Sequence, residues 1–150
     1  MSLKPISQSS MRNLNSSLKS AERALKIDTV TRHIYKEAIM AAERYGESRY
    51  VYSMPITQTN MFERCSLPST VGVGSYYVYI YNTDILEIMD AILIELRKLF
   101  EGQSVEYKIA TLMRLRNGSE EDVDRLDQAT RSEVHPNNSR KEHQIIIDWS

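Results

Sequence analysis

The stretch from residue 75 to residue 115 constrains the fold most, because its side-chain pattern changes twice within one run. From Ser75 to Tyr81 the side chains alternate between two faces, with aromatic or apolar groups on each. Residues 84–100 then repeat apolar side chains at steps of three and four, and residues 105–115 alternate again. A strand, a helix and a second strand in succession predict a right-handed crossover, in which the two strands lie parallel in one sheet.

A second helical pattern occupies the first third of the chain. Apolar residues recur at helical spacing from Leu14 to Tyr45, and Gly46 is a suitable residue to end that helix. Asp28 is a plausible N-cap, so the pattern allows either one long helix or two helices with a break at that residue. Residues 1–13 are rich in serine and lack periodicity, which predicts an extended or disordered polar arm.

Two further strands complete the predicted sheet. We expect them at residues 49–56 and 144–149, where β-branched and aromatic side chains concentrate. The last strand is expected to pair antiparallel with the strand at 105–115. Residues 57–74 contain proline and two glycines, which predicts a long loop.

These elements predict one α+β domain preceded by an arm. Residues 1–26 form a basic arm and the start of the first helix, and residues 27–150 form the domain. The domain is expected to be a two-layer mixed sandwich, with about four strands in one sheet and two main helices on one face. It carries a polar insertion at 117–142, in which Ser119 is placed to cap a short helix that runs to about Asp127.

Tyrosines dominate the strand at 75–81. Tyr77, Tyr79 and Tyr81 share one face of this strand, and the opposite face is apolar or aromatic as well. Both faces are therefore expected to be covered, one of them by a partner. Tyrosine is amphipathic and common at protein interfaces, so we expect these three residues to contact another protein. The alternative is a platform on which bases stack, although this strand lacks the Lys and Arg residues that such sheets usually carry.

Charge is distributed unevenly along the chain. The formal net charge is −1 at pH 7, from 19 basic and 20 acidic residues, which leaves no overall excess for coating nucleic acid. Residues 1–26 carry five basic residues against Glu22 alone, a net charge of +4, so the rest of the chain carries −5. Such a segment is either a solvated tail or an arm that docks on an acidic surface. The residues expected to make that contact are Lys4, Arg12, Lys19 and Arg23.

Features that would direct the chain to a membrane or to secretion are not evident. No apolar run approaches the roughly 20 residues of a membrane span. The N-terminal region has a lysine but no apolar stretch after it, which predicts no signal peptide. The single cysteine, Cys65, excludes an intramolecular disulfide. We therefore expect an intracellular, cytoplasmic protein.

The residue types that catalyse reactions or bind metals are scattered along the chain. His33, His135, His143 and Cys65 show none of the spacings that are typical of a zinc site. Arg64 is placed to lower the pKa of the Cys65 thiol. A nucleophilic cysteine also needs an oriented histidine, which no motif supplies, so a structural thiol is the favoured interpretation.

Phosphate binding and acid–base catalysis find equally little support. The glycine-containing segment at 69–75 precedes a strand, whereas phosphate-binding loops lie between a strand and the start of a helix. The carboxylates between Glu120 and Asp127 are typical of a solvated face, because catalytic carboxylates need burial or coupling. The sequence therefore predicts no catalytic residue, no metal and no cofactor.

The chain ends in Ile145-Ile146-Ile147-Asp148-Trp149-Ser150. This apolar segment predicts a terminal strand with Trp149 as a core anchor. Together with the buried helix and the strand at 105–115 that precede it, the ending resembles that of small uncharacterised proteins encoded by large cytoplasmic DNA viruses. The resemblance covers about the last third of the chain. It implies a virion component or a virus-encoded accessory protein, with no catalytic residues to transfer.

The sequence as a whole predicts a non-enzymatic structural or assembly protein. It would act through contacts with other protein subunits or with further copies of itself, and the resemblance implies a minor virion (capsid) component. The alternative is a single-stranded nucleic-acid-binding module that uses the tyrosines and the basic arm.

Overall fold

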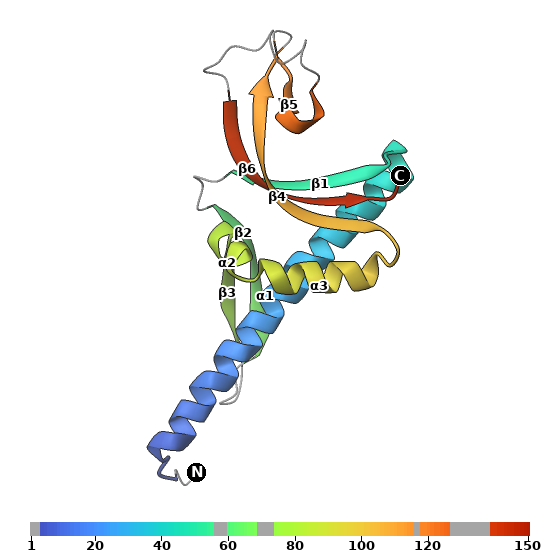
Figure 1. The fold of residues 1–150 in the computed structure, drawn as a ribbon. Helices are drawn as coiled ribbons and strands as arrows, with labels where there is room; N and C mark the ends of the chain where they lie inside the picture. The colour runs from blue at the N-terminus through green and yellow to red at the C-terminus, as the bar shows by residue number, and fades with distance from the viewer. Residues whose placement is uncertain (1–3, 56–59, 69–73, 116–117, 127–138) are drawn as a thin grey trace.

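The computed structural model describes residues 4–55, 60–68, 74–115, 118–126 and 139–150 (Figure 1). It confirms a mixed α+β chain, but with two sheets instead of one. The helices are α1 (Gln8–Tyr45), α2 (Asn82–Glu87), α3 (Met89–Leu99) and the short 3₁₀ helix η1 (Val123–Arg125). The strands are β1 (Arg49–Pro55), β2 (Met61–Pro68), β3 (Ser75–Tyr81), β4 (Ser104–Arg114), β5 (Glu120–Asp122) and β6 (Ser139–Asp148).

Helix α1 is longer than the sequence indicates. It begins at Gln8, where the Ser7 Oγ accepts a hydrogen bond of 3.1 Å from the Ser10 backbone N–H and so caps the first turn. The prediction that residues 1–13 are extended is therefore wrong for residues 8–13. The helix also runs through Asp28 without a break, because that carboxylate pairs with Arg32 one turn later instead of capping a new helix.

The two halves of α1 have different surroundings. From Val30 to Ala41 the helix buries one side against the rest of the chain. Residues 4–21 are all exposed, and Figure 1 shows this end of α1 projecting away from the body of the molecule. The body therefore supports the second half of the helix, whereas the first half extends into solvent.

The larger sheet is antiparallel, in the order β1-β6-β4-β5, and both α1 and α3 pack against it. The expected pairing of the last strand with 105–115 is confirmed, with Val105 opposite Ile147 and Tyr107 opposite Ile145. Strand β6 begins at Ser139, earlier than predicted, inside the polar stretch at 117–142. The fully buried side chains at the centre of the core are Val30, Ile34, Ile80, Ile85, Ile92, Leu96, Ile145 and Ile147.

Strand β3 does not belong to this sheet, so the predicted parallel crossover is wrong. It pairs antiparallel with β2, which lies in the segment that the sequence predicts as loop. The register of the β2–β3 hairpin shifts between Met61 and Glu63, and this irregularity interrupts the alternation of period two by which a strand is recognised. The inward-facing side chains of the hairpin pack beside α1 and contribute Ile80 to the core.

Two smaller elements also differ from the predictions. The helix expected at 84–100 is divided at Ile88 into α2 and α3. In place of a short helix after Ser119, residues 120–122 form strand β5 and residues 123–125 form η1, whose first turn is capped by the Asp122 side chain. Asp127 lies outside the described residues.

Candidate protein-interaction surfaces

The first surface is the exposed start of α1, which we call the projecting segment (residues 8–21). Met11, Leu14 and Leu18 are 54%, 51% and 38% exposed, and their spacing of three and four residues places them on one side of the helix. They do not continue the side of α1 that the body buries, because the 20 residues from Leu14 to the buried Ile34 make about five and a half turns. The projecting segment therefore presents an apolar stripe without a covering element among the described residues.

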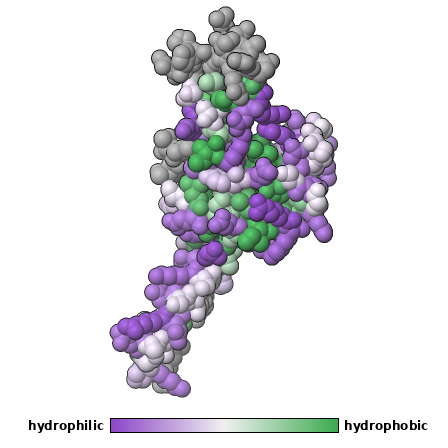
Figure 2. Space-filling model, viewed as in Figure 1, coloured by the Kyte–Doolittle hydropathy of each residue, from purple (hydrophilic) through white to green (hydrophobic). Residues whose placement is uncertain are grey.

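The predicted basic contacts lie on the same half of α1. Arg12, Lys19 and Arg23 are exposed and are separated by seven and four residues, so they share a face that differs from the apolar stripe. Lys4 is exposed just before the helix begins. In the view of Figure 2 the projecting segment is mostly hydrophilic, while hydrophobic side chains gather on the body over α3. The projecting segment is thus amphipathic, with one basic and one apolar side.

The second surface is the outer face of the hairpin. Tyr77, Tyr79 and Tyr81 are exposed, whereas Val78 and Ile80 between them are buried, so the alternation predicted for this strand is confirmed. No element among the described residues covers the tyrosine side, so its cover by a partner stays a prediction. The Arg64 guanidinium, from the neighbouring strand β2, lies 4.2 Å from the centre of the Tyr77 ring. We call this row of three tyrosines with Arg64 the tyrosine face.

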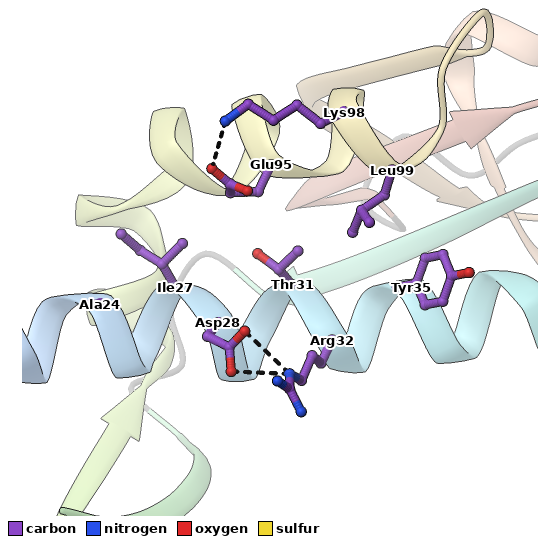
Figure 3. Close-up of a pocket in the computed structure, with 9 residues that line it drawn as sticks. All are labelled: Ala24, Ile27, Asp28, Thr31, Arg32, Tyr35, Glu95, Lys98 and Leu99. Atoms are coloured by element: carbon purple, nitrogen blue, oxygen red, sulfur yellow. Dashed lines mark hydrogen bonds and ion pairs between the residues drawn. The ribbon is translucent and has the colours of Figure 1, made fainter.

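A third surface is a groove between α1 and α3 that the sequence does not reveal. It encloses a cavity of about 730 Å³ (Figure 3). Figure 3 shows Ile27 and Thr31 extending from α1 toward α3, and Leu99 extending from α3 toward α1. Ion pairs lie on each helix, between Asp28 and Arg32 and between Lys98 and Glu95. The lining residues are Ala24, Ile27, Asp28, Thr31, Arg32 and Tyr35 from α1 with Glu95, Lys98 and Leu99 from α3.

Thr31 is the unusual residue of this groove. Its side chain is polar, yet the residue is only 6% exposed, and its Oγ1 atom has no hydrogen-bond partner among the described residues. A buried hydroxyl without a partner costs about 1–3 kcal/mol of stability. The small residues Ala24, Thr31 and Ala38 recur every seven positions on one side of α1, but this spacing alone does not predict that α3 lies beside them.

The groove continues along α1 toward the C-terminus of the chain. A second cavity of about 460 Å³ shares Tyr35 and Leu99 with the first and ends at Ala42 and Trp149. The Trp149 indole is half-buried against the core and donates a hydrogen bond of 2.9 Å to the Glu47 carbonyl oxygen. Trp149 therefore packs against the core as predicted and also closes one end of the groove.

Charged side chains form two groups of ion pairs on the larger sheet and the segment after it. Lys108 pairs with Asp122 and, at 3.3 Å, with Asp124, which ties η1 to the sheet. Arg140 pairs with Glu120 at 2.6 Å and with Glu142 at 3.0 Å. Burial alone would raise the pKa of Asp122, but the Lys108 ammonium and the Asp124 backbone N–H lower it below its ordinary value. Of the carboxylates between Glu120 and Asp127, these contacts account for Glu120, Asp122 and Asp124 as structural ion pairs.

The histidines and the cysteine also have structural neighbours. The Cys65 thiol donates to the Val78 carbonyl oxygen at 3.6 Å and lies 3.9 Å from the Thr29 hydroxyl, which joins the hairpin to α1. His33 packs edge-on against Phe62, with ring centres 5.0 Å apart. The Nδ1 atom of His143 lies 2.5 Å from the Tyr107 hydroxyl. Within the described ranges, no three His, Cys, Asp or Glu side chains converge on a position that could hold a metal ion.

Some predicted features cannot be placed. His135, most of the glycine-containing segment at 69–75 and the middle of the insertion fall outside the described residues. Of the helices that the structure describes, none is both long and apolar enough to cross a membrane.

Comparison of the chain with protein-family models, with curated proteins and with solved structures found no match. The functional argument therefore rests on the surfaces themselves. The seven contact residues predicted from the sequence lie in two places: the four basic residues at or just before the first half of α1, and the three tyrosines on the tyrosine face. The groove was not predicted from the sequence and is seen only in the structure.

Proposed function

We propose that this chain is a non-enzymatic structural or assembly subunit that acts through protein–protein contacts. The observation that carries the proposal is the exposed apolar stripe of the projecting segment. Helices in proteins draw most of their stability from packing an amphipathic face, and burying one leucine contributes about 1.5–3 kcal/mol. While they are exposed, Met11, Leu14 and Leu18 gain no free energy from burial. A neighbouring subunit that covers them would provide this stabilisation.

The tyrosine face supports the same proposal. Tyr77, Tyr79 and Tyr81 present rigid, amphipathic rings next to the Arg64 guanidinium. Tyrosine and arginine are enriched at protein interfaces because they bury a large area while keeping a polar end hydrogen-bonded. This face would form a second contact in the assembly. The resemblance of the C-terminal segment favours a virion as that assembly, with this chain as a minor component.

The test is the size of the complex that contains the chain in a lysate of its native source. We expect the full-length chain to elute well above its monomer mass of 17.4 kDa. The double substitution Leu14→Gln and Leu18→Gln should shift it toward the monomer. Ser16→Gln with Ser20→Gln is the matched control, because these residues are exposed on the opposite side of the helix. Unchanged elution of the Leu14 and Leu18 variant would contradict the proposal.

A second candidate function is the binding of single-stranded nucleic acid. The observation in its favour is the position of Arg64 over Tyr77, because β2 supplies the basic group that strand β3 itself lacks. Stacking of one base on an aromatic ring is worth about 1–3 kcal/mol. Fluorescence anisotropy with a labelled oligonucleotide should then show binding that weakens steeply with salt and weakens further in Tyr79→Ser. Absence of binding at low salt would eliminate this candidate.

A further inference from the structure

We propose that the groove between α1 and α3 receives the projecting segment of a second copy of this chain. The inference rests on the proposed function, since it takes the same projecting segment as the contact and names its partner. It accounts for three features together: an apolar stripe without a cover, a groove without an occupant, and a buried hydroxyl without a hydrogen bond.

The shape of the groove suits a helix. Its α1 side carries the small residues Ala24, Thr31, Ala38 and Ala42, which allow the backbone of another helix to approach closely. From Ala24 to Ala42 the groove runs along α1 for about 27 Å, and residues 8–21 form a helix about 20 Å long. Ile27, Tyr35 and Leu99 provide apolar surface for the stripe. An amphipathic helix lying in an apolar groove is a common mode of recognition.

The Thr31 hydroxyl in the middle of the groove needs a hydrogen-bond partner on the molecule that occupies the groove. Its Oγ1 atom is buried, has no partner, and extends toward α3 in Figure 3. Asn15 and Ser17 lie beside Leu14 and Leu18 on the projecting segment, and each has a side chain that can hydrogen-bond to a hydroxyl. A purely apolar occupant would leave the Thr31 hydroxyl unsatisfied, whereas this segment can satisfy it.

Two observations identify the occupant as a second copy. The segment cannot enter its own groove, because both belong to the same continuous helix (Figure 1). Residues 1–26 carry a net charge of +4 and the rest of the chain −5, so the segment of one copy is attracted to the body of another. The apolar stripe and the groove lie on different sides of α1, because the nine residues from Leu18 to Ile27 make about two and a half turns. The contact is therefore head-to-tail, from the segment of one copy to the groove of the next.

The experiment measures the mass of the purified full-length chain by light scattering over a wide concentration range. We expect an average mass above 17.4 kDa that rises with concentration, because a head-to-tail contact leaves a free groove and a free segment on each complex. Leu99→Glu places a charge in the groove and should weaken this self-association at least tenfold. Ile94→Glu is the matched control, because Ile94 lies on the same helix, is 53% exposed compared with 51% for Leu99, and does not line the groove. Circular dichroism verifies that both variants are folded, as their exposed positions predict.

A mixing experiment separates this inference from the proposed function. The Leu14→Gln and Leu18→Gln variant keeps its groove and the Leu99→Glu variant keeps its segment, so a mixture should form a heterodimer more tightly than either variant alone. If the segment variant dissociates but Leu99→Glu still self-associates, the groove is not the receptor and only this inference fails. If the purified chain is monomeric at every concentration, a second copy is not the occupant, and the complex size in the native lysate still decides the proposed function. If neither variant changes the self-association, both proposals fail.

Discussion

Ile80→Ala tests how the hairpin is attached to the body. Ile80 is fully buried on strand β3, and the hairpin shares no backbone ladder with the four-stranded sheet. Its attachment among the described residues therefore depends on inward-facing side chains such as Ile80, Phe62 and Cys65. The substitution removes three carbon atoms from the core. At about 0.8 kcal/mol for each buried methylene, the free energy of unfolding falls by about 2.4 kcal/mol. The cavity left behind raises this loss of stability to about 3–4 kcal/mol.

The next residue along the strand supplies the matched control. Tyr79 points outward and is exposed, so Tyr79→Thr, which keeps a β-branched side chain in the strand, should change stability by no more than about 0.5 kcal/mol. Urea unfolding followed by circular dichroism gives both free energies of unfolding and the slope of each transition. Equal effects of the two substitutions, or a cost below about 1 kcal/mol for Ile80→Ala, would refute the described packing of the hairpin.

Three further predictions concern single groups. The lowered pKa of Asp122 stabilises the fold at pH values above its ordinary value of about 4, and this contribution is lost as the pH falls through the folded-state pKa. Asp122→Asn should therefore destabilise the chain at neutral pH, and the difference from the unmodified chain should shrink in unfolding curves below pH 4. Gly46 ends α1 with φ of 62°, in the left-handed region that a side chain with a Cβ atom disfavours. Gly46→Ala should therefore lower the free energy of unfolding, measured by thermal denaturation, by about 1 kcal/mol. Ser7→Ala removes the N-cap of α1 and should speed amide hydrogen exchange in residues 8–12 without changing global stability, because this end of the helix is not packed.

The sequence predicts elements well where a single periodicity persists. The alternation of β3 is confirmed, and a helix covers the repeat from Leu14 to Tyr45. Strand β4 also forms as predicted, but its buried side changes from Val105 to Ala110 and Leu112, so its simple alternation is wrong. Strand β2 was missed because the register shift after Met61 breaks the period of two, and proline and glycines surround the segment. The extension of α1 to Gln8 depends on the Ser7 cap, which a serine-rich stretch conceals.

The arrangement of the elements is harder to predict than their existence. The same apolar pattern in strand β3 suits a central strand of the main sheet or one strand of a separate hairpin, and tertiary packing decides between them. The outward position of Tyr77, Tyr79 and Tyr81 follows from alternation, whereas their exposure depends on that packing. The groove could not be predicted for the same reason, since it exists only where α3 is placed beside the small residues of α1.

Cross-linking between copies tests the central claim most directly. One copy carries Leu18→Cys and another carries Leu99→Cys, both with Cys65→Ser so that no other thiol reacts. After mixing and treatment with a short bis-maleimide, we expect a covalent dimer of twice 17.4 kDa that forms only when both variants are present. Replacing Leu99→Cys by Ile94→Cys should abolish it. Absence of the dimer, or equal yield with Ile94→Cys, would contradict the placement of the projecting segment in the groove of a second copy.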